Sequence, residues 1–245
     1  MKPFISIKNI TKTYNSISGH DTNALKNITL NIEKDDFISI VGTSGSGKTS
    51  LLKLISGIDT PTKGEIIFKR KNSKIGYVFQ ENTVFPWRTV QNNIGFPLEV
   101  NHVTKTIRHD KINNICKLVG LPLEQFLHKY PHELSGGQKR RVAIGMALAF
   151  EPEILLLDEP TSQLDDLTKY HIQKTLLSIW RQKGITIILV THDINEAIFL
   201  SEKVVSLKSG IINDVFEIDI TRPREFETYK SKEFSKYHTQ VFKSL

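Results

Sequence analysis

Apolar and polar residues alternate through much of the first forty positions of this chain of 245 residues. The pattern is clearest at residues 4–10 and 28–32. Successive side chains of a β-strand point to opposite faces of the sheet, so such alternation is typical of strands with one buried face. These segments therefore predict antiparallel strands with one face covered.

Short apolar runs, which are typical of buried strands, occur at residues 37–41 and 154–157. We expect strands at residues 37–41, 65–68, 75–79, 153–158, 185–191 and 204–207. Helical spacing of apolar residues occurs at residues 50–55, about 165–182 and about 193–200, and glycines at positions 57 and 184 are placed to end two of these helices. The alternation of strands and helices predicts an α/β core with a mainly parallel sheet.

The segment from about residue 88 to 149 has no strand pattern and is predicted to be helical. We expect one domain, in which residues 1–87 and 150–210 form a RecA-like core with an antiparallel β subdomain. Residues 88–149 would form an inserted helical subdomain. The tail at 211–245 is predicted to add a short strand and a charged helix that contains aromatic residues.

Composition says more about the cellular compartment of the protein than about its activity. The chain is 39% hydrophobic, enough to bury a substantial core, and Cys116 is its single cysteine, so no internal disulfide can form. Cys116 lies in an apolar helical pattern and is expected in the core. The first residues lack a signal-peptide pattern, and the longest apolar runs are far shorter than the roughly 20 residues that span a bilayer. We expect a soluble chain in a reducing compartment.

The net charge of +7 is spread along the sequence rather than concentrated in blocks. Such a charge is compatible with anionic ligands, an acidic lipid surface or nucleic acid, and it does not choose among them.

A glycine-rich loop joins the expected strand at 37–41 to the expected helix at 50–55. It reads GxxxxGK[ST] and consists of Gly42, Thr43, Ser44, Gly45, Ser46, Gly47, Lys48 and Thr49. Glycines let backbone N–H groups turn toward a phosphate, and the helix start adds its positive dipole end. Lys48 can reach the terminal phosphates, and the hydroxyl of Thr49 can hold Mg²⁺. The sequence predicts that this chain binds a nucleoside triphosphate.

Two acidic residues follow the apolar run at 154–157. Asp158 ends this expected strand, where ligands of open α/β sheets bind, and an aspartate there can hold Mg²⁺. Glu159 comes next and is placed to orient and polarise an attacking water. With the phosphate loop upstream, this pair predicts hydrolysis of the triphosphate.

A third motif lies between the other two and reads Leu-Ser-Gly-Gly-Gln. Its last four residues are Ser135, Gly136, Gly137 and Gln138. With these motifs in this order, the chain resembles a nucleotide-binding subunit of the ATP-binding-cassette (ABC) family over roughly residues 4–210. The resemblance implies the ABC-type fold with a P-loop NTPase core, ATP as substrate, and Mg²⁺.

The resemblance also implies roles for residues that are unremarkable by themselves. Tyr14 matches the aromatic residue that stacks on adenine, and Gln80 the glutamine that contacts Mg²⁺ and the attacking water. His192 matches the histidine that contacts the γ-phosphate. The segment 162–165 resembles the loop that touches the site of the facing subunit, with Gln163 in place of the usual alanine.

In the family the signature motif of one subunit faces the phosphate loop of another. A chain with one set of motifs is therefore expected to act as a dimer that closes on two ATP molecules and opens after hydrolysis. After the signature, the family usually continues with Gln-Arg-Val-Ala-Ile-Ala-Arg-Ala-Leu. Here the run begins at Arg140 and reads Arg-Arg-Val-Ala-Ile-Gly-Met-Ala-Leu, so Gly145 and Met146 depart from that pattern.

The loop that carries Gln80, the glutamine loop, is followed by aromatic residues at Phe85, Trp87 and Phe96. They are consistent with core residues at a helix entry, or with a groove that receives a short helix of a membrane-spanning partner. The sequence of this segment and of residues 220–228 is similar to importers of the nitrate, sulfonate, taurine and bicarbonate group. A related cassette for a thiamine precursor or another small organic solute is an alternative.

That similarity implies two transmembrane permease subunits, an extracytoplasmic solute-binding protein and a place at the cytoplasmic face of the membrane. No nucleic-acid partner is expected. The DNA-repair type of ABC ATPase carries a long coiled coil between its nucleotide motifs, whereas Lys48 and Asp158 lie only 110 positions apart here (158 − 48 = 110). The ribosome-acting type has two cassettes in one chain. A soluble cassette that acts on an Fe–S assembly scaffold remains an alternative.

Overall fold

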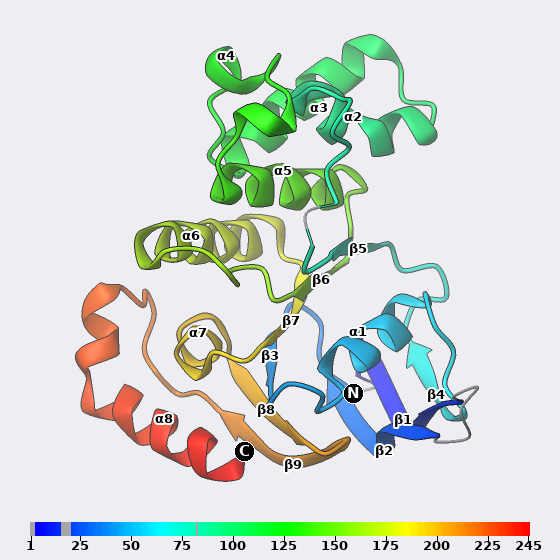
Figure 1. Ribbon diagram of the computed structural model, residues 1–245, viewed down its shortest axis with the longest axis vertical. Helices are drawn as coiled ribbons and strands as arrows, with labels where there is room; N and C mark the ends of the chain where they lie inside the picture. Colours follow the sequence, from blue (N-terminus) through cyan, green and yellow to red (C-terminus); the bar gives the residue numbers. More distant parts are fainter. Residues whose placement is uncertain (1–2, 16–20, 82) are drawn as a thin grey trace. The chain divides into compact units, whose positions relative to one another are not determined.

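The computed structural model of the protein describes residues 3–15, 21–81 and 83–245. The chain forms two compact units (Figure 1). The first unit consists of residues 1–73 and 186–245, and the second of residues 74–185. The helical segment expected at 88–149 lies within the second unit, and its role as a separate subdomain stays a prediction.

An antiparallel sheet begins the first unit. Its strands are β1 (Ile5–Tyr14), β2 (Thr22–Ile32) and β4 (Lys63–Phe68), in the order β2-β1-β4. Both neighbours pair antiparallel with β1, and Ile5 lies opposite Ile32 on one side and Phe68 on the other. The expected antiparallel arrangement is confirmed, although β1 and β2 are longer than the alternating pattern indicated.

A second set of strands in this unit carries the phosphate loop. The strands β7 (Thr186–Thr191), β3 (Phe37–Val41) and β8 (Lys203–Lys208) are parallel neighbours, and β9 (Ile211–Glu217) pairs antiparallel with β8. Every residue of β3 and β7 is buried, which explains their unbroken apolar runs. The helix α1 (Lys48–Ser56) follows β3, and α7 (Ile194–Leu200) follows β7.

The second unit contains two parallel strands and a series of helices. β5 (Ile75–Val78) pairs with β6 (Ile154–Asp158), so the strands expected there are confirmed. The helices are α2 (Val90–Val100), α3 (Lys105–Leu118), α4 (Leu123–Phe126), the 3₁₀ turn η1 (Pro131–Glu133), α5 (Gly136–Ala149) and α6 (Asp166–Lys183). Gly184 ends α6 in the left-handed conformation, with φ 56°, as its position predicted.

Cys116 lies on the buried side of α3 and packs as a core residue, as the sequence predicted. Burial raises the pKa of its thiol to about 11, which keeps the sulfur protonated and unreactive at neutral pH. No helix within the described ranges is both long and apolar enough to span a bilayer.

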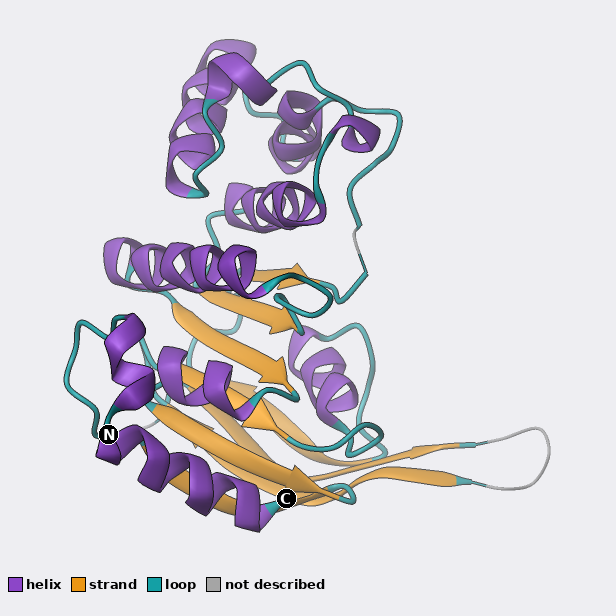
Figure 2. Cartoon of the chain, turned by 60° about the vertical axis from the view of Figure 1, so that its left-hand side comes forward, coloured by secondary structure: helices purple, strands orange, loops and turns teal. Residues whose placement is uncertain are grey.

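The tail packs back onto the first unit. After β9 it forms the 3₁₀ turn η2 (Phe226–Lys230) and the helix α8 (Lys232–Ser244), as the expected strand and helix indicated. Figure 2 shows α8 running along the strands β8 and β9, which it contacts. Phe234 and Val241 are the apolar side chains that α8 buries.

Arg224, between β9 and η2, is buried and lies at the end of α7. Its guanidinium donates hydrogen bonds of 2.7 Å to the carbonyl oxygens of Ile198 and Ser201 and one of 3.1 Å to that of Ile218. The last carbonyls of a helix have no partner within the helix and carry partial negative charge, so a buried cation stabilises them. Sequence reasoning assigned no role to this residue.

Replacing Arg224 with methionine should lower the free energy of unfolding by about 3 kcal/mol, because several buried carbonyls lose a charged donor. Urea unfolding followed by circular dichroism measures this. The control is Lys236→Met on the exposed side of α8, which should change stability by less than about 0.5 kcal/mol. Equal stability of the two variants would contradict the anchoring role of Arg224.

Candidate functional site

The phosphate loop leaves the end of β3 and enters α1, the expected strand–loop–helix context. Gly47 has φ 102°, and a Cβ at this position would collide with the carbonyl oxygen of Ala24 on β2. A Cβ at Gly42 would collide with the carbonyl oxygen of Leu207 on β8. The loop can lie this close to two strands only because glycine occupies both positions.

The start of α1 fits a phosphate group. Gly47 is the N-cap of α1 and has no side chain with which to cap the first N–H groups of the helix. The Lys48 ammonium lies over the loop and donates to the carbonyl oxygens of Gly42 at 2.8 Å and Thr43 at 3.0 Å. The buried hydroxyl of Ser46 has no hydrogen-bond partner among the described residues. A phosphate oxygen would satisfy that hydroxyl and the helix N–H groups together.

His192 emerges beside the phosphate loop because their strands are neighbours. In the parallel pairing of β3 with β7, Val41 lies opposite Thr191, so the loop and His192 leave the same edge of the sheet. The His192 side chain is exposed. Asp193 caps α7 by accepting a hydrogen bond of 3.1 Å from the backbone N–H of Glu196, which fixes the turn after His192.

Tyr14 ends β1 and is connected to α1. Its hydroxyl bonds to Ser50 on α1 at 3.3 Å and to Asp59 at 3.0 Å. The Lys12 ammonium lies 4.8 Å from the centre of the Tyr14 ring and 2.6 Å from the Asp59 carboxylate, and this hydrogen bond lowers the pKa of Asp59. These contacts hold the half-exposed ring close to the phosphate-loop helix. Its stacking on adenine stays a prediction.

The second unit holds the expected acidic pair at the end of β6. Asp158 is buried, and its carboxylate accepts a hydrogen bond of 3.2 Å from the hydroxyl of Tyr77 on β5. Burial raises the pKa of Tyr77, and the neighbouring charge of Asp158 raises it further. Tyr77 therefore remains a protonated donor to Asp158. A carboxylate at this place suits Mg²⁺, which prefers hard oxygen ligands.

Gln80 and Glu159 meet at the ends of the paired strands β5 and β6. The Gln80 Nε2 amide donates to a carboxylate oxygen of Glu159 at 3.2 Å. Glu159 has φ 44°, a left-handed conformation that is uncommon for a residue other than glycine. Backbone strain of this kind is frequent at functional sites, and here it occurs at the residue expected to be the base.

The signature residues form the start of α5. The Ser135 hydroxyl accepts from the backbone N–H of Gln138 at 3.3 Å, and the Gln138 side chain accepts from the backbone N–H of Ser135 at 2.9 Å. This reciprocal pair is a capping box. Gly137 lies against Thr168 of α6 so closely that a Cβ would not fit. The motif thus has a structural role within the chain as well as its expected role toward ATP.

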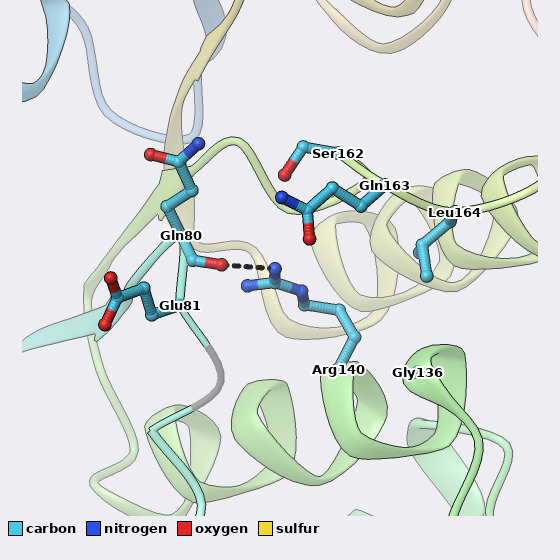
Figure 3. A pocket seen from close by; sticks show the side chains of 7 residues that line it. All are labelled: Gln80, Glu81, Gly136, Arg140, Ser162, Gln163 and Leu164. Carbon is cyan, nitrogen blue, oxygen red and sulfur yellow. Dashed lines mark hydrogen bonds between the residues drawn. The ribbon is translucent and has the colours of Figure 1, made fainter.

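A cavity of about 420 Å³ in this unit joins three of the expected segments (Figure 3). The glutamine loop, the signature helix and the loop after β6 all line it. Its residues are Gln80, Glu81, Gly136, Arg140, Ser162, Gln163 and Leu164. The structure therefore brings Gln80, Gly136 and Gln163 together. It adds Arg140, to which the sequence motifs assign no function.

Within each unit the expected residues gather at the ends of parallel strands. The first unit collects Gly42–Thr49 and His192 and holds Tyr14 beside α1. The second collects Gln80, Asp158 and Glu159. The roles of these residues toward ATP and Mg²⁺ stay predictions.

Comparison with known proteins identifies the family. The ABC transporter family model matches residues 25–162. The chain belongs to the ABC transporter family. An uncharacterised ABC transporter ATP-binding protein of Methanocaldococcus jannaschii is 40% identical, with 100% of this chain and 95% of that protein covered.

Two further relatives are named as ATP-binding proteins of importers. The aliphatic sulfonates import ATP-binding protein SsuB of Bacillus cereus strain ZK / E33L is 41% identical over 97% of this chain and 95% of its own length. The nitrate import ATP-binding protein NrtC of Synechocystis is 44% identical over 91% of this chain, which spans 35% of NrtC.

Solved structures agree with the ABC cassette fold. A dimeric ATP-binding cassette, MJ0796, in a post-hydrolysis state bound to ADP and Pi matches with a TM-score of 0.79 and 35% identity, covering 89% of this chain and 100% of its own. CbiO1 from Clostridium perfringens, part of the ABC transporter complex CbiONQ, matches with a TM-score of 0.80 and 29% identity, covering 99% of this chain and 97% of its own. The chain is an ABC-family ATPase with the expected fold.

Replacing Lys48 with alanine should weaken ATP binding by roughly 10- to 100-fold, because a buried ammonium that can bond to phosphate is lost. Calorimetric titration with ATP·Mg measures the dissociation constant. Lys53→Ala on the same helix changes the charge equally and should leave the affinity within about twofold. Equal losses in both variants would indicate a general charge effect rather than a contact made by Lys48.

Proposed function

We propose that this chain is the ATP-hydrolysing subunit of a membrane importer for a small solute of the sulfonate or nitrate kind. Two copies would dock on the cytoplasmic face of two transmembrane permease subunits, and a separate solute-binding protein would deliver the solute outside. The single observation that supports import most directly is the likeness to SsuB and NrtC over at least nine-tenths of this chain.

An exposed aromatic patch in the second unit suits a permease partner. Trp87 is 72% exposed, so it is not a core residue. Phe85 lies next to it with ring centres 5.7 Å apart, and Phe96 packs edge-on to Phe85 at 4.8 Å. Arg88 lies over the ring of Phe96 at 4.9 Å. A rigid aromatic surface of this kind is typical of sites that receive a short helix of a partner.

The proposed hydrolysis of ATP follows from the types of residue at the carboxyl ends of the parallel strands in each unit. The phosphate loop and Lys48 bind the phosphates of ATP, and Glu159 orients and polarises the attacking water. Gln80 holds Glu159, and His192 donates to the γ-phosphate. Thr49, Gln80 and Asp158 are the residues that would hold Mg²⁺, which neutralises phosphate charge when it is bound.

The signature residues act on a second copy of the chain. The start of α5 offers helix N–H groups and a positive dipole end to an anion, and each chain has one such motif and one phosphate loop. Two copies arranged head to tail would bury two ATP molecules, and hydrolysis to ADP with loss of phosphate would open the dimer again. The dimeric cassette bound to ADP and Pi supports this arrangement.

Replacing Glu159 with glutamine should lower the ATPase rate by about 100- to 10,000-fold while ATP still binds, because the amide cannot accept a proton from water. ATP·Mg should then trap a dimer that size-exclusion chromatography detects. Glu151→Gln makes the same charge change before β6 and should keep the parental rate. Hydrolysis by Glu159→Gln at the parental rate would disprove the role of Glu159 as the base. A monomer at saturating ATP·Mg would disprove the ATP-bound dimer.

Replacing Trp87 with alanine should leave the ATPase rate of the isolated chain within about twofold but reduce solute uptake at least about tenfold, because a central aromatic anchor is lost. Uptake is measured in cells that co-express the chain with permease subunits with which it co-purifies. Phe242→Ala removes an aromatic side chain of similar exposure, 66%, from α8 and should not affect uptake.

Purification of the chain from the cells in which uptake is measured tests the alternative of a soluble ABC ATPase that acts on an Fe–S assembly scaffold. Co-purification of the chain with an integral-membrane protein supports the importer. Recovery with a soluble scaffold instead, and uptake that is unaffected by Trp87→Ala, would favour the alternative.

A further inference from the structure

Arg140 connects the signature helix to the glutamine loop. It lies on α5, two residues after Gln138, and is only 4% exposed. Its two terminal guanidinium nitrogens donate hydrogen bonds of 2.6 Å to the carbonyl oxygens of Phe79 and Gln80. Figure 3 shows the guanidinium between α5 and the glutamine loop, with the bond to Gln80 dashed.

This pair of bonds fixes the backbone of the loop. A guanidinium is planar and presents its donors in a rigid fork, so two successive carbonyls held by one fork cannot rotate independently. Both bonds are charge-assisted, which makes them stronger than hydrogen bonds between neutral groups. The backbone of Gln80 is thereby placed relative to the start of α5.

The segment that Arg140 holds, Phe79 and Gln80, is connected to both Asp158 and Glu159. The Gln80 amide is 3.2 Å from the Glu159 carboxylate. The Phe79 ring packs against that of Tyr77 with centres 4.2 Å apart, and the Tyr77 hydroxyl bonds to Asp158 at 3.2 Å. Movement of the Arg140 fork would therefore shift the groups that contact Asp158 and Glu159.

We propose that Arg140 is a positioning residue that couples the signature helix to the hydrolytic carboxylate through Gln80. The inference rests on the proposed roles of Gln80 and Glu159. In the family run quoted above, glutamine stands at this position, and a single carboxamide nitrogen cannot supply a two-nitrogen fork. Arg140, which makes this coupling, therefore differs from the residue that the family pattern has at this position.

Arg140→Ala should lower kcat for ATP hydrolysis about 10- to 100-fold, because a small displacement of catalytic groups is enough for a loss of this size. The dissociation constant for ATP·Mg should stay within about twofold. Added guanidinium ion at millimolar concentration should restore part of kcat, since the cavity of about 420 Å³ beside Arg140 gives it access. Arg140→Lys should be intermediate, because an ammonium can donate to the carbonyls without the planar fork.

Two controls separate positioning from general stability. Arg108→Ala removes a less deeply buried arginine of the same unit, which donates to the carbonyl of Val103 at 3.1 Å. It should change neither kcat nor its response to guanidinium. Methylammonium at the same concentration should rescue Arg140→Ala less than guanidinium does, because it lacks the planar fork.

Parental kcat in both Arg140 variants would overturn the proposal, as would equal losses in kcat and ATP affinity without rescue. If Arg140→Ala does not fold, Arg140→Lys decides: reduced kcat with unchanged affinity supports the coupling, and parental kcat overturns it. Glu159→Gln is measured alongside. If Glu159→Gln remains active, the proposed base is wrong; if it is inactive while the Arg140 variants are normal, only the coupling is wrong.

Discussion

The register of the parallel strands is the constraint on which the candidate site depends. Val41 lies opposite Thr191 in one pair of strands, and Val78 lies opposite Leu157 in the other. These pairings bring the phosphate loop to His192 and Gln80 to the acidic pair, although the partners are far apart in sequence. A slip of one residue would turn every side chain of a strand to the opposite face, where it would not fit its packed neighbours.

The candidate site also requires unusual backbone geometry at the strand ends. Gly47 takes φ 102° where a side chain would collide with β2, and Glu159 takes φ 44° despite its side chain. Glu159 precedes Pro160, and a residue before proline is disfavoured in the right-handed helical region. The strain of about 1–3 kcal/mol that such a conformation costs is tolerated where surrounding contacts fix it, and the hydrogen bond from Gln80 is one of them.

The sequence predicted the buried strands best, because burial on both faces leaves an unbroken apolar run. The strand at 37–41 has the expected bounds, and that at 154–158 differs by one residue. The antiparallel strands were predicted too short. Their pairing is irregular between Ile7 and Ile10, and Asn9 and Asn27 have positive φ, so the alternation breaks while the strands continue. The loop motifs were found because phosphate chemistry requires particular residue types in order.

Buried arginines were missed because their partners are backbone carbonyls, which leave no trace in the sequence. Arg140 bonds to residues about 60 positions earlier, and Arg224 bonds to Ile198 and Ser201, which lie over 20 positions earlier. Each must have such acceptors, since burying a guanidinium without them would cost several kcal/mol. Arg140 fixes the segment that carries Gln80, and Arg224 fixes the far end of α7, the helix that begins just after His192. A buried guanidinium therefore holds the backbone of Gln80, which is expected to contact Mg²⁺ and the attacking water. Another holds the helix that follows His192, which is expected to contact the γ-phosphate.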